Sequence, residues 1–188
     1  MMKKLLSEKG KRITGLVLII ISIIMVVSFI MPYLSAKGDY KKYLKDYATE
    51  MNTEEIEMTN ADAVNVSLYE FFRIYQYGWS HGQQKEVSAL YTIMIGIVVV
   101  LSILILISAL CRKPIAVIIF NIFEILVFRI LASEFKILGL VKNGRYVFGV
   151  GYYIYYLSFI VAIVLAVVLL IIKINEKKLK RTIEKMEE

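Results

Sequence analysis

Three polar residues interrupt one of the most apolar stretches of the chain, and they are the best candidates for chemistry. Asn121, Glu124 and Arg129 all lie within the segment FNIFEILVFRIL. A carboxyl group among apolar side chains can exchange a proton, and placing it near the middle of a membrane costs roughly 2.5 kcal/mol or more. Such residues therefore face protein or water, and Glu124 is the first candidate for a functional side chain.

Two serines in other apolar stretches are predicted to lie at a depth similar to that of Glu124, counting ~1.5 Å per residue along each helix. Arg129 lies nearer the outer surface, where it can reach lipid head groups, Tyr155 or Tyr156. The candidate polar site therefore comprises Ser22, Ser102, Asn121, Glu124 and Arg129. Three interpretations stay open for it. It is a protonatable group in a permeation or coupling path, a protonated carboxyl that fixes helix register, or a contact with a membrane-embedded partner.

The elements that must position these residues are four apolar segments. The chain has 188 residues, of which 59% are hydrophobic, and a mean hydropathy of +0.66. The excess is concentrated in four blocks that almost lack charge, and each is long enough to cross a ~30 Å hydrocarbon core as a helix. Lipid offers no partner for an open strand edge, so these spans must be helical.

The predicted fold is an all-α membrane protein, a four-transmembrane-helix up-down bundle with a helical external segment between the first two spans. A small-residue stripe on the fourth span, Ser158, Ala162 and Ala166, favours close helix packing. The predicted segments are a cytoplasmic basic tail (1–12), span one (13–31), the external segment (32–86), span two (87–110), a cytoplasmic turn (111–113), span three (114–132), an external loop (133–150), span four (151–172) and a second cytoplasmic basic tail (173–188).

The orientation follows from the distribution of Lys and Arg. Of the 23 basic residues, 13 lie in the two tails and the turn between spans two and three. The positive-inside rule therefore places both termini in the cytoplasm. The Lys-, Ile- and Tyr-rich, Cys-poor composition favours a bacterial plasma membrane. The alternative is a signal peptide cleaved after Ala36, but its apolar core would exceed the usual ~7–15 residues.

The external segment carries six basic and nine acidic residues and two helix signals. Asp39 can cap a helix with one face formed by Tyr40, Tyr43, Leu44, Tyr47 and Met51. Ser67 and Glu70 have the spacing of a capping box for a second helix. The candidate external interaction face comprises Leu68, Phe71, Phe72, Tyr75 and Trp79. It packs on the outer ends of the chain's own spans or docks another protein.

We predict that the chain is not an enzyme and binds no cofactor. Residues 78–82, GWSHG, match the G-x-S-x-G motif of serine hydrolases, but we expect a glycine-flanked turn there. The catalytic base of that motif is a separate His folded back onto the serine, a geometry that His81, next to Ser80, cannot take. One His and one Cys are too few for a zinc or iron site or an internal disulfide. The basic tails lack the aromatic or motif context of a nucleic-acid site, so no nucleic acid is expected.

The order of parts resembles a group of small four-span membrane proteins of Gram-positive bacteria. The resemblance rests on Met31-Pro32-Tyr33 at the end of the first span and on Ser67-Leu68-Tyr69-Glu70 in the external segment. This group is uncharacterised, so the resemblance implies a layout and carries no activity. Claudins share the layout, but their external tryptophan and cysteine motif is missing, since Trp79 stands alone and the external segment has no Cys.

The predicted function is that of a multi-pass plasma-membrane protein that acts by protein–protein interaction, as an accessory subunit, an immunity-type protector or a membrane scaffold. Its expected partners are the lipid bilayer and another membrane or external protein, or a second copy of itself. The alternative is a small oligomeric channel or proton-coupled carrier that uses Glu124.

Overall fold

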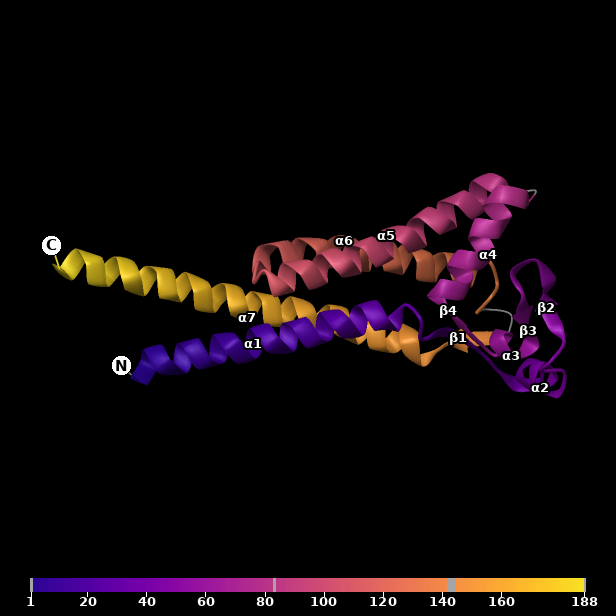
Figure 1. The fold of residues 1–188 in the computed structure, drawn as a ribbon, viewed down its shortest axis with the longest axis horizontal. Coiled ribbons are helices and arrows are strands. Elements are labelled where there is room, and N and C mark those ends of the chain that lie inside the picture. The colour runs from indigo at the N-terminus through magenta and orange to yellow at the C-terminus, as the bar shows by residue number, and fades with distance from the viewer. Residues whose placement is uncertain (1, 83, 142–144, 188) are drawn as a thin grey trace.

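The computed structural model describes residues 2–82, 84–141 and 145–187. Seven α-helices make up most of this part of the chain, so the protein belongs to the all-α class, with two small sheets at one end (Figure 1). Residues 142–144 of the predicted external loop lie outside the described residues.

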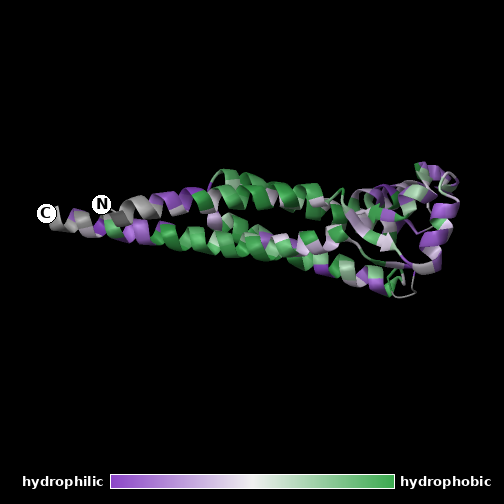
Figure 2. Cartoon of the chain, turned by 90° about the horizontal axis from the view of Figure 1, so that it is seen from below, coloured by the Kyte–Doolittle hydropathy of each residue, from purple (hydrophilic) through white to green (hydrophobic). Residues whose placement is uncertain are grey.

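Four of the helices are long and apolar enough to cross a membrane. They are α1 (Met2–Ser28), α5 (Lys85–Leu110), α6 (Pro114–Ile137) and α7 (Val150–Glu187). Each contains one of the predicted spans or most of it, and α6 and α7 continue beyond the predicted ends. Figure 2 shows their apolar middle sections between a polar end that holds both termini and a mixed end that holds the sheets.

The four long helices pack in neighbouring pairs. α1 contacts α7 and α5, and α6 contacts α5 and α7. On α7 the small residues Ser158, Ala162 and Ala166 are all buried, as the predicted stripe requires. Large aliphatic side chains on the opposite faces, such as Leu157 at 61% exposure, point outward. The helices therefore bury small, polar and some large apolar side chains between them, and the side chains that they present to their surroundings are mainly Leu, Ile and Val.

Residues 32–81 and 146–148 build a cap over one end of these helices. Its elements are β1 (Pro32–Ala36), α2 (Gly38–Asp46), β2 (Met51–Thr53), the 3-10 turn η1 (Glu54–Ile56), β3 (Met58–Thr59), α3 (Asn60–Ala63), β4 (Asn65–Ser67), α4 (Leu68–His81) and β5 (Tyr146–Phe148). The strands are short, and the sequence analysis did not predict them.

The central strand of the cap is β1, which pairs antiparallel with β4 on one side and β5 on the other. The strand begins at Pro32, a position where the missing N–H removes no ladder bond. Gly149 and Gly151 let the start of α7 approach this strand closely. A Cβ on Gly149 would lie 2.4 Å from the carbonyl oxygen of Pro32, and one on Gly151 would lie 2.8 Å from it.

Two helix predictions in this region need correction, and one is confirmed. The helix predicted from Asp39 to Met51 begins at Gly38, without a side-chain cap, and ends at Asp46. It ends there because the chain turns to form the β2–β3 hairpin. The turn predicted at residues 78–82 is helical up to His81. The capping box is confirmed, since Ser67 accepts from the Glu70 amide and the Glu70 carboxylate accepts from the Ser67 amide.

Tyr33 on β1 forms the centre of an aromatic cluster that joins the cap to the long helices. Its ring lies edge-on to Phe128 and Phe135 of α6 at 5.6 and 5.5 Å, to Phe148 of β5 at 5.9 Å and to Tyr152 of α7 at 5.6 Å. Burial raises the pKa of the Tyr33 phenol well above its usual value. Its hydroxyl has no hydrogen-bond partner among the described residues. The cluster therefore holds the cap by apolar packing rather than by polar contacts.

We expect the close approach at Gly149 to make this position intolerant of a side chain. Gly149→Ala should lower the free energy of unfolding by about 1–3 kcal/mol, because β1 must move away from the start of α7. Gly96→Ala is the matched control, since a Cβ there meets no atom within 4 Å, and it should stabilise α5 by up to about 1 kcal/mol. Thermal unfolding in a mild detergent measures both, and equal effects would contradict the predicted contact.

Candidate functional site

Glu124 is fully buried between the long helices, with an exposed fraction of 0%. One of its carboxyl oxygens, Oε1, accepts two hydrogen bonds. The first comes from the hydroxyl of Ser102 on α5, and the second from the hydroxyl of Tyr155 on α7 at 2.6 Å. The hydroxyls of Ser102 and Tyr155 are also within hydrogen-bond distance of each other. Three helices therefore meet at a single polar atom.

Tyr155 is the member of this site that the sequence analysis did not find. Its place in the tyrosine-rich start of α7 suggested an aromatic residue at the membrane interface, or a contact with Arg129. The structure instead buries Tyr155, at 2% exposure, against Phe128 and Phe159, with ring centroids 4.8 Å apart in both pairs. The signal in the sequence was the helical spacing from Tyr155 to Ser158 and Ala162, which places the tyrosine on the buried stripe of small residues.

The remaining residues of the predicted polar site do not reach Glu124 by a hydrogen bond. Ser22 and Asn121 are fully buried, but each bonds back to its own helix, to the carbonyl oxygens of Leu18 and Val117. Arg129 is exposed on the outer face of α6 and is not part of the site. Of the five residues of the predicted polar site, Ser102 and Glu124 are therefore joined by a hydrogen bond, and Tyr155 is added to them.

Two acceptor oxygens in the same region lack a donor among the described residues. These are Oε2 of Glu124 and Oδ1 of Asn121, which lie one helical turn apart on α6. The buried polar residues that the structure describes include no Lys or Arg. An ionised carboxylate here would therefore have no buried counter-ion, and a proton or a small bound species would supply the missing partner.

The candidate external interaction face is mostly turned inward. Leu68 and Phe71 are buried, and the ring of Phe71 lies tilted against that of Phe135 on α6, with centroids 4.6 Å apart. Tyr75 lies 4.8 Å from the ring of Tyr91 on α5, and burial raises the pKa of its phenol. Phe72 is half-buried, and Trp79 is the exposed member. The face therefore packs on the chain's own helices, which is the first of the two predicted alternatives, and Leu68 and Phe71 are not accessible to a partner.

A different set of aromatic residues is exposed at the far end of the cap. Tyr43, Tyr47 and Met51 are 50%, 48% and 49% exposed, and the two tyrosine rings lie 5.1 Å apart. They belong to α2, its C-terminal cap and β2, which lie at the end of the molecule farthest from the chain termini (Figure 1). We call these three residues the distal aromatic patch. The sequence placed them on one helical face together with Leu44, which is buried.

The Ser80–His81 pair lies at the end of α4, where the hydroxyl of Ser80 is 2.8 Å from Nδ1 of His81. The same hydroxyl also bonds to the carbonyl oxygens of Gln76 and Tyr77, and the imidazole stacks on Tyr77 at 4.6 Å. The pair is exposed on a helix rather than on a strand–turn–helix elbow, which the hydrolase motif requires.

The described residues contain no group of three or more His, Cys, Asp or Glu side chains placed to hold a metal ion. Comparisons with protein-family models, with curated proteins and with solved structures give no match.

The hydrogen bonds of Glu124 predict a graded response to substitution. Glu124→Gln retains an acceptor oxygen and should change stability little. Glu124→Ala removes the acceptor that both hydroxyls share and opens a cavity, and should cost about 2–5 kcal/mol. Tyr155→Phe and Ser102→Ala should each cost about 0.5–2 kcal/mol. Ser22→Ala is the matched control, because that hydroxyl bonds only to its own helix. Unfolding in detergent measures the series, and a Glu124→Ala protein as stable as Ser22→Ala would refute the site.

Proposed function

We propose that the chain is a multi-pass protein of the bacterial plasma membrane, with both termini in the cytoplasm, that acts by contact with another protein. The four long apolar helices form an up-down bundle across the bilayer, and the cap lies outside the cell. Support for this topology comes from the outward-facing aliphatic side chains of the helices and from the basic residues at the opposite end. The proposed topology counts α1 as a membrane span and β1 as the central strand of the cap.

The observation that carries the interaction proposal is the distal aromatic patch. Tyr43, Tyr47 and Met51 are each about half exposed, although they lie where neither the chain's own helices nor a bilayer would cover them. Tyrosine and methionine are enriched at the centres of protein interfaces. The role of an accessory subunit, an immunity-type protector or a membrane scaffold fits a small protein whose accessible aromatic side chains lie on an external cap.

The native cysteine provides a direct test of the topology. Cys111 is exposed in the turn between α5 and α6 and is the only cysteine of the chain. A membrane-impermeant maleimide should label it in inverted vesicles and leave it unlabelled in intact cells. In a Cys111→Ser background, Tyr47→Cys should show the reverse pattern. Labelling of Cys111 in intact cells would overturn the proposed orientation.

The interaction is tested by purification from native membranes in a mild detergent. A second protein should co-elute in a stoichiometric amount, and the double variant Tyr43→Ser, Tyr47→Ser should reduce its yield about tenfold or more, as expected when interface aromatic residues are removed. Tyr69→Ser is the control, because Tyr69 is 46% exposed elsewhere on the cap. If the native chain purifies without a second protein, and the double variant and the control do the same, the proposal is refuted.

A second function is favoured by the unpaired oxygen of Glu124. We propose as the alternative a small oligomeric channel or proton-coupled carrier in which this carboxyl exchanges a proton. Its test is ion flux in proteoliposomes at two pH values. The alternative expects a pH-dependent flux that Glu124→Gln abolishes, and the interaction proposal expects no flux and a normal phenotype for this variant.

A further inference from the structure

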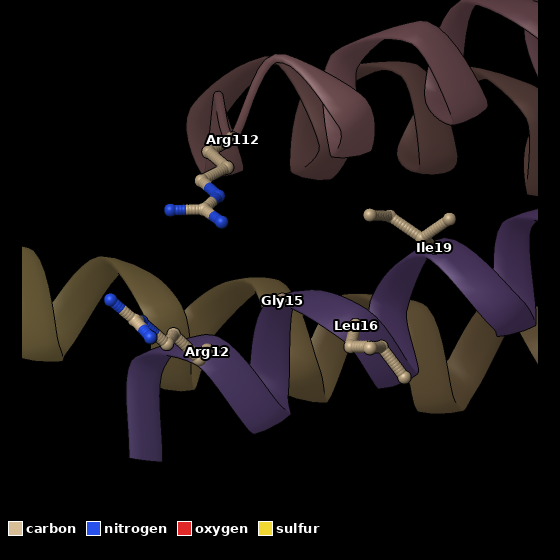
Figure 3. A pocket seen from close by; sticks show the side chains of 5 residues that line it. All are labelled: Arg12, Gly15, Leu16, Ile19 and Arg112. Carbon is tan, nitrogen blue, oxygen red and sulfur yellow. The ribbon is translucent and has the colours of Figure 1, made fainter. Parts of the chain in front are cut away.

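A pocket of about 420 Å³ lies between α1 and the turn that joins α5 to α6, at the end of the bundle that holds the chain termini. Its lining consists of Arg12, Gly15, Leu16, Ile19 and Arg112. Figure 3 shows the side chain of Arg112 reaching from the turn toward α1, on which Arg12 lies one helical turn before Gly15. The volume falls within the ~300–1,000 Å³ typical of small-molecule sites.

The two guanidinium groups at this pocket have no acidic partner among the described residues. The ion pair nearby joins Lys11 of α1 to Glu176 of α7, and Lys173 donates to the carbonyl oxygen of Arg112. Lys11 and Lys173 are thus already engaged in these contacts, while the side chains of Arg12 and Arg112 are exposed. A guanidinium group binds a phosphate through two parallel hydrogen bonds, so this pair of like charges is complementary to a phosphate group.

The rest of the pocket is apolar. Leu16 is 60% exposed and Ile19 is half-buried, and both continue the wall from the arginines toward the middle of α1. Gly15 leaves the wall open, because a Cβ at this position would meet no atom within 4 Å. The occupant that fits this lining therefore has an anionic head and an apolar tail.

The backbone of Arg112 is strained in a way that a topological role does not require. Its φ is +52°, in the left-handed region, and the amide of Lys113 bonds to the carbonyl oxygen of Ser108 to close the helix end. Glycine usually occupies this position, and other residues pay a conformational cost there. The positive-inside rule needs a charge near the turn, which Lys113 already provides, but it does not need an arginine at the strained position.

We propose that this pocket binds the phosphate head group of an anionic phospholipid from the inner leaflet, between Arg12 and Arg112, with an acyl chain along Leu16 and Ile19. This inference rests on the proposed topology, which places the pocket at the cytoplasmic surface. Anionic lipids are concentrated in that leaflet, and basic residues near the surface attract them.

The test uses the full chain purified in a neutral detergent and titrated with phosphatidylglycerol, with phosphatidylcholine or with inorganic phosphate, with bound species measured by native mass spectrometry. Phosphatidylglycerol should bind more tightly than phosphatidylcholine. The double variant Arg12→Gln, Arg112→Gly should weaken its binding about tenfold or more. Glycine relieves the strained backbone, so this variant does not lose binding through a misfolded turn.

Two further variants make the outcome decisive. Gly15→Leu fills the pocket without removing a charge and should also weaken phosphatidylglycerol binding, while its open surroundings and higher helix propensity keep α1 intact. Lys177→Gln, Lys178→Gln removes two exposed charges outside the pocket and should leave binding within about twofold of the native protein.

Equal binding of the two lipids, or unchanged phosphatidylglycerol binding in both pocket variants, overturns the proposal. If inorganic phosphate binds, loses its binding in the arginine double variant, and neither lipid binds, the ligand is free phosphate and the lipid proposal is overturned. The maleimide test of Cys111 separates these results from a failure of the proposed topology. If Cys111 is labelled in inverted vesicles and the lipid test fails, only the lipid site is wrong.

Discussion

A carboxyl group inside an apolar helix bundle must find its hydrogen-bond donors within the protein, and Glu124 imposes this constraint on the long helices. Oε1 takes one donor from α5 and one from α7, so the rotation of three helices about their axes is tied to one atom. Phe128, one turn farther along α6, stacks on Tyr155 at 4.8 Å and supports the same rotation by apolar contact. Polar and apolar requirements therefore select a single arrangement of these helices.

Phe128 also connects the polar site to the cap. Its ring contacts Tyr155 on one side and Tyr33 of β1, at 5.6 Å, on the other. A movement of β1 would therefore press on the aromatic layer that holds the hydroxyl of Tyr155 against Glu124. The cap and the buried carboxyl belong to one packed unit, although the two proposed functions use different parts of it. A partner bound to the cap would therefore be linked, through Tyr33 and Phe128, to the site where Oε2 of Glu124 has no hydrogen-bond donor.

The sequence predicts the long helices well because ~20-residue apolar runs leave few alternatives. The capping box at Ser67 was predictable for a similar reason, since its residues lie within one turn. The cap sheet was not predictable, because its strands are two to five residues long and β1 pairs with β5 across most of the chain. In the sequence, the apolar neighbours of Glu124 and the depth counted along each helix identified Glu124 and Ser102. Tyr155 resembled the neighbouring tyrosines expected at the membrane interface. The helical spacing from Tyr155 to Ser158 and Ala162 was the signal that distinguishes this tyrosine from its neighbours.

The position of β1 at the centre of its sheet has a consequence for biogenesis. This strand leaves the ribosome early, but its β5 partner and the α7 helix that covers α1 are synthesised more than a hundred residues later. One edge of the strand and one face of the first helix therefore wait uncovered until translation is nearly complete. Earlier partners are already present, since β1 pairs with β4 and α1 packs against α5. The β5 edge of the sheet and the contact between α1 and α7 are therefore completed last, after the long loop that separates them in sequence is closed.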